Sequence, residues 1–282
     1  MTDPAPHCLV PGQPVDLDAL PTAGEADREA FEAELDSLRD QLAEWQRALY
    51  AERRRSLLIV LQAMDAGGKD STIRKVFRGV NPQSIRVASF KEPSALEREH
   101  DFLWRIHQQI PSAGMISIFN RSHYEDVLVV RVDRIVPEST WRERFDQIND
   151  FEARLAASGT TILKFFLHIS PEEQAERFRD RLQRPEKNWK FSRGDLDKRR
   201  QWYDYQQAYQ DVLEKCTTEV APWHVIPADR KWFRNTVIAR TIVSTLETIN
   251  PQYPTTTEDL TGITIADSIE GGDGAGGVNG AA

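Results

Sequence analysis

The stretch LLIVLQAMDAGGKDSTIRKVFRGV, residues 57–80, decides the fold. It opens with five large apolar residues, passes through a turn that contains Gly67 and Gly68, and continues with apolar residues at helical spacing. A short apolar run that ends at a glycine turn is typical of a buried strand. A strand, a glycine turn and a helix in this order direct backbone N–H groups and the helix N-terminus at an anion. The stretch therefore predicts a phosphate-binding loop.

Four further apolar runs follow at intervals long enough for crossover helices, and they predict an α/β fold. The runs are IRVASF (85–90), MISIF (115–119), TILKFFLHI (161–169) and WHVIP (223–227). Runs that are apolar throughout indicate strands buried on both faces, as in a parallel sheet covered by helices. We therefore expect a three-layer α/β/α architecture with about five parallel strands, closed by a helix over 230–249. Functional side chains should follow the carboxyl ends of the strands.

The two ends of the chain differ from this central region. Residues 1–30 are predicted to form an irregular arm, because the first 23 residues contain several prolines and no periodicity. Residues 254–282 hold seven of the 15 glycines and few large apolar residues, so we expect a disordered tail. The domain should therefore span 31–253. It should begin with a helix whose apolar stripe is Phe31, Leu35, Leu38, Leu42, Trp45 and Leu49.

Composition and charge narrow the class of protein. The sequence contains no run near the roughly 20 apolar residues that cross a bilayer, no secretory signal and only two cysteines, so we expect a cytoplasmic protein without a membrane partner. The net charge of −8 hides an asymmetry. Residues 1–45 carry −9 and residues 254–282 carry −5, which leaves +6 on residues 46–253. The basic central region predicts a polyanionic ligand.

The loop after the first apolar run matches the Walker A pattern imperfectly. Lys69 is placed to reach a terminal phosphate, whereas Ala63 replaces the first glycine and Asp70 replaces the magnesium-binding Ser or Thr. Asp65 is a carboxylate inside the loop. It either points outward as a turn residue or holds a magnesium ion, and we favour the metal. The other predicted phosphate-binding residues of the loop are Ala66, Gly67, Gly68, Asp70 and Ser71.

A second cluster follows the third apolar run, in the sequence FNRSHYED (119–126). Asn120 stands where a Walker B aspartate is expected. Arg121 should face the same crevice as Lys69, where a guanidinium can bind phosphate oxygens. Glu125 and Asp126 can supply the negative charge that Asn120 lacks, although acids in a first turn also favour a helix N-terminus. The predicted metal ligands are Asp65, Asn120, Glu125 and Asp126.

The third cluster, residues 177–200, contains ten basic and four acidic side chains. Such a run is often only a solvated helix face. Here Arg177, Arg181 and Arg184 share one helical face, and Pro185 and Gly194 are expected to break the segment into two helices around NWKFS. Two helices with cations on their inner side predict a mobile lid, over about 172–206, that closes on phosphates.

Together, the three clusters resemble the polyphosphate kinase 2 family, especially its class III. The matching strings are MDAGGKDSTIRKV, SFKEPSALEREHDFLWRIH, FNRSHYEDVLVVRV, RPEKNWKFSRGDLDKRRQWYDYQQAY and APWHVIPADRKWFRN, which span about residues 57–240. One difference is the string GGKDST, where AGKDGT is commoner in the family, so Ser71 replaces a glycine. The resemblance implies a P-loop kinase fold with a helical lid, in a homo-oligomer of two or four chains.

The resemblance also implies an activity, which is magnesium-dependent, reversible phosphoryl transfer from inorganic polyphosphate to AMP and ADP, with manganese as an alternative ion. Lys69 and Arg121 would neutralise the transferring group and Asp65 would hold the metal, so these three are the implied catalytic residues. A linear polyanion also explains the number of successive cations. The implied polyphosphate-binding residues outside the loop are Arg177, Arg181, Lys187 and Lys190.

Two other functions stay open at this point. The first is an ATP-dependent nucleotide kinase of the same fold, which needs a basic lid but no extended basic channel. The second is a non-catalytic module that binds a polyanion or nucleic acid. We do not expect nucleic acid as a partner, because the sequence contains no recognised nucleic-acid motif.

Overall fold

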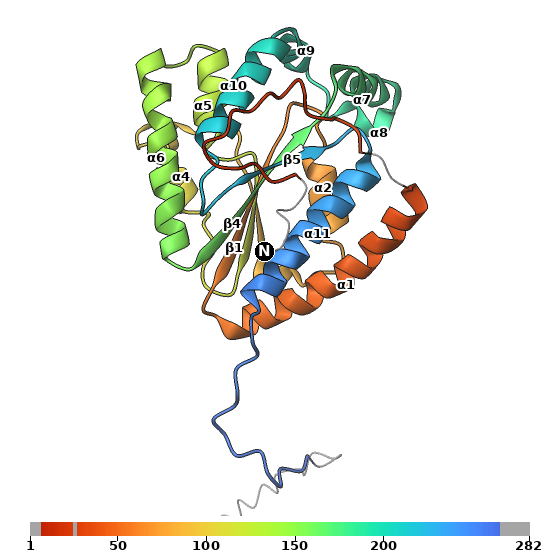
Figure 1. Ribbon diagram of the computed structural model, residues 1–282, viewed down its shortest axis with the longest axis vertical. Helices are drawn as coiled ribbons and strands as arrows, with labels where there is room; N and C mark the ends of the chain where they lie inside the picture. The colour runs from red at the N-terminus through yellow and green to blue at the C-terminus, as the bar shows by residue number, and fades with distance from the viewer. Residues whose placement is uncertain (1–6, 25–26, 266–282) are drawn as a thin grey trace, which may run out of the picture.

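The apolar run of residues 57–61 forms β1 (Ser56–Gln62), the central strand of a five-stranded sheet. The computed structural model describes residues 7–24 and 27–265 and places the strands in the order β2–β3–β1–β4–β5, with every pairing parallel (Figure 1). The predicted α/β fold is confirmed. The other strands are β2 (Ile85–Ser89), β3 (Ile116–Asn120), β4 (Thr160–His168) and β5 (Trp223–Pro227).

Helices cover both faces of the sheet (Figure 1). One face carries α1 (Arg28–Glu52), α2 (Lys69–Val76) and α11 (Lys231–Ile249), and α1 packs along α11. The other face carries α4 (Trp104–His107), α5 (Glu125–Val132) and α6 (Glu138–Ala157). The short elements η1 (Pro82–Ser84) and α3 (Ala95–Arg98) lie in the connections on either side of β2. At the carboxyl ends of the strands lie α7 (Pro171–Gln183), α8 (Pro185–Asn188), α9 (Arg193–Arg200) and α10 (Trp202–Lys215).

The helix α1 begins and ends at residues suited to helix termini. Asp27 caps its start by accepting a hydrogen bond from the backbone N–H of Glu29, and the chain leaves the helix at Arg53 in the left-handed conformation. Its apolar stripe faces the core, since Leu35, Leu38, Leu42 and Leu49 are buried while Phe31 and Trp45 pack partly buried against them. Tertiary burial of this face, more than intrinsic propensity, stabilises the helix.

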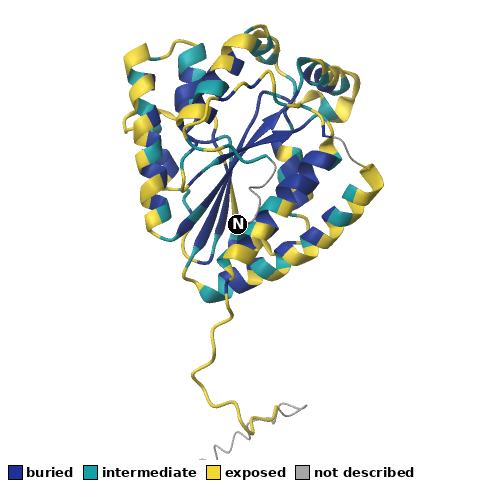
Figure 2. Cartoon of the chain, viewed as in Figure 1, coloured by how far each residue is buried: buried dark blue, intermediate teal, exposed yellow. Residues whose placement is uncertain are grey.

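The strand β2 differs from the prediction that all five strands are buried on both faces. Of its five residues only Ala88 is buried, and Arg86, Val87 and Ser89 are exposed. The physical reason is an uncovered edge, because β2 pairs only with β3, whereas residues 7–9 cover β5 at the other edge of the sheet. Figure 2 shows the contrast with the fully buried central strands.

The segments before and after the domain core contain little regular structure. Residues 7–24 form turns and one antiparallel bridge, between Cys8 and His224 at the β5 edge, yet Val15 and Leu17 are buried. Residues 254–265 contain no helix or strand and are exposed. The rest of the predicted tail, 266–282, lies outside the described residues, as do residues 1–6 of the predicted arm. Within the described ranges no helix is long and apolar enough to cross a membrane.

A buried ion pair fixes the helix that follows β3. The Lys164 ammonium on β4 lies 2.6 Å from the Glu152 carboxylate on α6, and both side chains are fully buried. The Tyr124 hydroxyl donates to Glu152 at 2.7 Å and accepts from Lys164 at 2.8 Å. Because Tyr124 immediately precedes α5, this cluster fixes the turn that carries Arg121 and Glu125. A buried charge pair of this kind favours one arrangement only where its hydrogen bonds are complete, as they are here.

Candidate phosphate-binding site

The loop between β1 and α2 is shaped by its small residues. Ala66 has φ 61° and Gly68 has φ 104°, both in the left-handed region. A Cβ atom on Gly67 would lie 2.4 Å from the Cβ of Ala63, so the tight turn leaves no room for a side chain. No side chain caps the start of α2, which leaves its first N–H groups available to an anion.

Lys69 lies beneath this loop as a buried cation. Its ammonium donates to the carbonyl of Ala63 at 2.8 Å. Burial, reinforced by the nearby Arg121 guanidinium, lowers the pKa of Lys69 to about 8. The ammonium is therefore poorly neutralised in the free protein, and a phosphate group at the loop would supply the missing negative charge.

The three predicted catalytic residues come together. The Arg121 guanidinium donates to the Asp65 carboxylate at 2.8 Å and lies 3.5 Å from Glu125. Burial works to lower the pKa of Arg121, but Glu125 and Asp65 outweigh it and raise that pKa. The contact follows from the sheet, because β1 and β3 are neighbours and end side by side. Arg121 has φ 62°, and its backbone N–H donates to Leu61 at the end of β1.

Two carboxylates line a small pocket at this place. Asp65 and Glu125 border it together with Arg121, Tyr205 and Tyr209, and its volume is about 20 Å³. That volume holds one water molecule or one ion. Burial raises the pKa of the Tyr205 and Tyr209 hydroxyls well above their usual range, so both tyrosines line the pocket as neutral groups.

The other two predicted metal ligands lie elsewhere. The Asn120 amide donates to Asp70 at 2.7 Å. Asp126 faces Arg105 at 3.4 Å and Arg144 at 3.5 Å, so two arginines occupy its carboxylate. In the described part of the chain, no three Asp, Glu, His or Cys side chains gather in a metal-binding group. The four predicted metal ligands therefore do not lie together. Of the four, only Asp65 and Glu125 border the same small pocket.

Two buried arginines donate hydrogen bonds to backbone carbonyls of the loop. Arg177 of α7 was expected to line a polyphosphate path, but its guanidinium donates to the backbone carbonyls of Ala66 at 2.9 Å and Ala228 at 2.6 Å. Arg234 of α11 donates to the Gly67 carbonyl at 3.3 Å and to the Ser71 hydroxyl at 3.0 Å. Burial, with Arg177 nearby, lowers the pKa of Arg234 to about 9.

Sequence reasoning missed Arg234, although a signal was present. The residues after β5, including Arg230, Lys231 and Arg234, satisfy the same rule that identified the loop, because they follow the carboxyl end of a strand. The Ser71 hydroxyl, where the family more often has glycine, does not crowd the helix start. It donates to the Gly68 carbonyl at 2.8 Å and accepts from Arg234.

Half of the ten cations of residues 177–200 form ion pairs with acids of α7–α9, whereas Arg179, Arg193, Lys198 and Arg199 form none within the described residues. Arg181 lies 3.5 Å from Asp195 and Lys187 lies 2.5 Å from Asp180. Lys190 reaches the loop, where its ammonium lies 3.7 Å from Asp70. Pro185 begins α8, as expected for a residue that breaks the preceding helix. Gly194 lies in the first turn of α9 and does not interrupt that helix, which begins after its cap residue Ser192.

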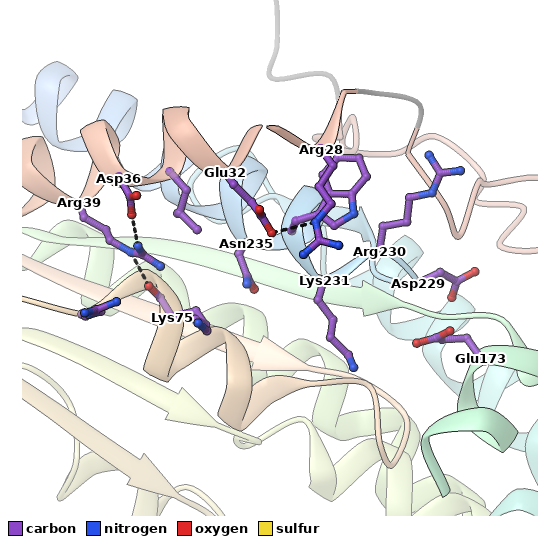
Figure 3. Close-up of a pocket in the computed structure, with 13 residues that line it drawn as sticks. Arg28, Glu32, Asp36, Arg39, Lys75, Glu173, Asp229, Arg230, Lys231 and Asn235 are labelled. Atoms are coloured by element: carbon purple, nitrogen blue, oxygen red, sulfur yellow. Dashed lines mark hydrogen bonds and ion pairs between the residues drawn. The ribbon is translucent and has the colours of Figure 1, made fainter. Parts of the chain in front are cut away.

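Two larger cavities lie over opposite faces of the sheet. The first, named the α5 cavity, has a volume of about 770 Å³ and includes Phe90, Lys91, Arg105, Arg121 and Lys198 in its lining. The second, named the α1 cavity, has a volume of about 680 Å³ and lies among α1, α2, α7 and the start of α11 (Figure 3). Arg121 lines the α5 cavity, whereas Glu173 and residues 229–232 line the α1 cavity.

Comparison with known proteins gives one consistent result. A model of the family described as polyphosphate kinase 2 matches residues 25–254. The AMP/ADP-polyphosphate phosphotransferase of Meiothermus ruber is 53% identical over 233 residues, covering 83% of this chain and 87% of that protein. The ADP-polyphosphate phosphotransferase of Rhodopseudomonas palustris is 44% identical, covering 87% and 90%. The crystal structure of polyphosphate kinase 2 from Arthrobacter aurescens TC1 superposes with a TM-score of 0.85 at 39% identity, covering 87% and 90%.

The geometry of the loop predicts unequal effects of two glycine substitutions. Gly68→Ala places a methyl group 2.0 Å from Arg234 and keeps an unfavourable φ, so we expect a loss of about 2–4 kcal/mol in the free energy of unfolding. Gly79→Ala is the matched control, because Gly79 also has a positive φ but nothing lies within 4 Å, and we expect a loss of about 1 kcal/mol. Urea unfolding of both variants measures the difference, and equal losses would show that Arg234 does not constrain the loop.

Proposed function

Because this chain belongs to the polyphosphate kinase 2 family, we propose that it transfers phosphoryl groups reversibly between inorganic polyphosphate and the adenine nucleotides AMP and ADP. The observation that carries the proposal is the meeting of Lys69, Arg121 and Asp65 at a glycine loop whose backbone is held by two buried arginines. Such a site concentrates positive charge in a partly desolvated place, where phosphate oxygens are bound strongly.

The chain's own residues act mainly by position and charge. Phosphoryl transfer passes through a loose transition state, with charge spread over the equatorial oxygens, so the reaction requires neutralisation more than a nucleophilic side chain. Lys69 and Arg121 neutralise the transferring group from two sides, and the first N–H groups of α2 bind its neighbour in the chain. Arg177 and Arg234 keep the loop in the binding conformation and do not themselves contact the reacting atoms.

The pair of carboxylates fits a magnesium ion. Mg²⁺ in phosphotransfer sites is held by one or two carboxylates together with substrate phosphates and water, and Asp65 and Glu125 border a pocket of the size of one ion. Asp65 and Glu125 would hold Mg²⁺, or Mn²⁺ in its place, which would supply positive charge against the phosphate oxygens. In the free protein the Asp65 carboxylate pairs with Arg121. When Arg121 binds the phosphate instead, that carboxylate becomes available to the metal.

The α5 cavity has the size and lining for the acceptor nucleotide. Its volume of about 770 Å³ is within the range of small-molecule sites. Lys198 offers charge for the nucleotide's phosphates, and Arg105, which lies between Asp126 and the ring of Phe90, lines the same cavity. Lys91 and Glu92, which follow the second predicted strand, lie in the same lining. Arg121 joins this cavity to the loop, so an acceptor bound here would lie next to the transferring group.

The proposal includes three features besides the activity. The closing of residues 172–206 as a lid, a homo-oligomer of two or four chains, and a cytoplasmic location stay predictions. An ATP-dependent kinase of the same fold and a non-catalytic polyanion-binding module remain as the alternatives that the assay below separates.

The first test supplies ADP, magnesium and polyphosphate without ATP, and the expected product is ATP. Lys69→Ala and Arg121→Ala should each lower kcat/KM by about 100- to 1000-fold, the usual effect of removing one electrostatic group from such a site. Arg154→Ala is the control, because Arg154 is exposed on α6 and should leave the rate unchanged. Transfer only from ATP would favour the nucleotide kinase, and binding of polyphosphate without turnover would favour the non-catalytic module.

The metal proposal predicts a specific defect for Asp65→Asn. The amide is a weaker magnesium ligand than the carboxylate, so the magnesium concentration at half-maximal rate should rise by about tenfold, the lower end for a residue that supports a metal. Asp126→Asn is the contrasting variant, because Asp126 pairs with Arg105 and Arg144 and should change the KM for nucleotide instead. A magnesium titration of Asp65→Asn that matches the wild-type titration would remove Asp65 from the metal site.

The lowered pKa of Lys69 predicts a pH dependence. The ammonium must be charged to bind phosphate, and its pKa of about 8 means that kcat/KM falls as the pH rises through 8 instead of near 10.5. Bound polyanion favours the charged form, so the corresponding fall in kcat should lie at higher pH. In Lys69→Arg the guanidinium keeps its charge, and whatever activity remains should not decline over this range. A wild-type kcat/KM that stays level to pH 9.5 would contradict the assignment.

A further inference from the structure

Residues 7–24, named the strap, run from the edge of the sheet past α10 to the segment before α11 (Figure 1). The first residues of the strap pair with β5. Its middle passes α10, where the Gln210 side chain accepts from the backbone N–H of Leu17 at 3.3 Å. Its last residues lie beside residues 229–230, which follow β5. The strap therefore lies at the same end of the sheet as the phosphate-binding loop.

The strap is held by burial, although it contains no helix. Val15 and Leu17 are buried in the core of the domain. Gly24 packs so closely on Phe233 that a Cβ atom at this glycine would lie 2.3 Å from the aromatic ring. Ordering an irregular backbone costs conformational entropy, which the burial of these apolar groups offsets. The strap therefore has a defined position on the domain.

The end of the strap fixes the segment between β5 and α11. The backbone N–H of Asp229 donates to the Thr22 carbonyl at 3.0 Å. The Arg230 guanidinium donates to the Gly24 carbonyl at 2.7 Å. Asp229 lies in neither a strand nor a helix, so no secondary structure determines its position. These two contacts with the strap do so instead.

The Asp229 side chain also reaches the start of α7. Its carboxylate accepts from the backbone N–H of Ser170, the cap residue of α7, at 2.8 Å. In a capping box, the acid three residues after the cap accepts from this N–H. Glu173 has that position in α7, but its carboxylate lies 2.6 Å from Arg177 and pairs with it. Asp229 therefore supplies, from a distant part of the chain, the acceptor that α7 lacks.

The same segment binds the arginine that holds the phosphate-binding loop. One end nitrogen of the Arg177 guanidinium donates to the carbonyls of Ala228 at 2.6 Å and Asp229 at 3.2 Å. The other donates to the Ala66 carbonyl at 2.9 Å. Ala66 has φ 61°, a conformation that a residue with a side chain keeps only where its surroundings enforce it. A continuous set of contacts thus leads from the strap through Asp229 and Arg177 to the loop.

We propose that Asp229 is a positioning residue of the phosphate site and that the strap holds it in place. Asp229 does not contact the reacting atoms. It aligns the start of α7 and the carbonyls that bind Arg177, so that the loop keeps the conformation that receives the transferring phosphate. This inference rests on the proposed function and gives a role in it to the N-terminal arm.

The test compares two substitutions of Asp229. Asp229→Ala removes the acceptor for Ser170, and kcat with polyphosphate and ADP should fall about 10- to 100-fold, since misplacing a reacting group by about 1 Å has an effect of this size. The KM for polyphosphate should change less than about threefold, because every cation that binds the donor is kept. Asp229→Asn keeps an oxygen that accepts from Ser170, so its kcat should return to within about threefold of the wild-type value.

A control separates positioning from a general loss of stability. Asn250 ends α11 at the opposite end of the sheet and has φ 49°. Asn250→Ala keeps this unfavourable conformation without the asparagine, so the variant should unfold at a lower urea concentration with an unchanged kcat. A fall in kcat of Asn250→Ala equal to that of Asp229→Ala would overturn the proposal.

The part played by the strap is tested by a double-mutant cycle. Leu17→Ala loosens the strap at its buried anchor and should lower kcat less than Asp229→Ala does. If the strap acts through Asp229, the kcat of Leu17→Ala/Asp229→Ala should lie within about twofold of that of Asp229→Ala alone. Losses that multiply, or a wild-type kcat in Leu17→Ala, would overturn the role of the strap.

Amide hydrogen exchange reports the same contacts without turnover. The Gly67 N–H of the loop donates to the Met64 carbonyl at 2.9 Å, and its exchange should be faster in Asp229→Ala but not in Asp229→Asn. Unchanged exchange and kcat in Asp229→Ala would overturn the proposal, as would an Asp229→Asn variant as slow as Asp229→Ala, which would assign the effect to charge. If the wild-type protein forms no ATP from polyphosphate and ADP, the proposed function has failed, and faster exchange in Asp229→Ala would still support the positioning of the loop.

Discussion

The structure around the phosphate-binding loop depends on buried positive charge that the protein neutralises only in part, through the pairing of Arg177 with Glu173. Lys69, Arg177 and Arg234 are all buried, and most of their hydrogen bonds go to uncharged oxygens, chiefly backbone carbonyls. Carbonyl dipoles stabilise a cation without cancelling its charge, and removing three cations from water is costly. The lowered pKa values of Lys69 and Arg234 express that cost. An anion at the loop offsets it, so the free protein is already arranged for a ligand of high negative charge.

The fold brings this charge to one place by simple means. The central strand β1 lies between β3 and β4, so the loop after it, the turn after β3 and the helix after β4 share one end of the sheet. The turn after β3 must also be rigid, because Arg121 has a left-handed backbone that a non-glycine residue adopts only when its surroundings enforce it. The buried cluster of Tyr124, Glu152 and Lys164 supplies those surroundings from the far side of the turn.

The limits of prediction from the sequence follow from the same structure. Strand positions and the meeting of Asp65, Lys69 and Arg121 could be predicted, because apolar runs and strand order determine them locally. The partners of individual side chains could not. Glu125 and Asp126 are adjacent in one helical turn, yet Glu125 faces Arg121 and Asp126 faces two other arginines. Those two arginines come from elements that are distant in the sequence. Likewise, a basic run does not reveal that Arg177 binds backbone carbonyls while Lys190 reaches the loop.

The contact between Lys190 and Asp70 has a consequence for how a polymer gains access. Its atoms are 3.7 Å apart and both side chains are partly exposed, so the contact contributes less than about 1 kcal/mol. Thermal energy is sufficient to break so weak a contact many times while a polymer lies against the protein. A strand of phosphates much longer than the protein can then be laid in sideways with its terminal unit at the loop, and that end need not be threaded through a closed channel.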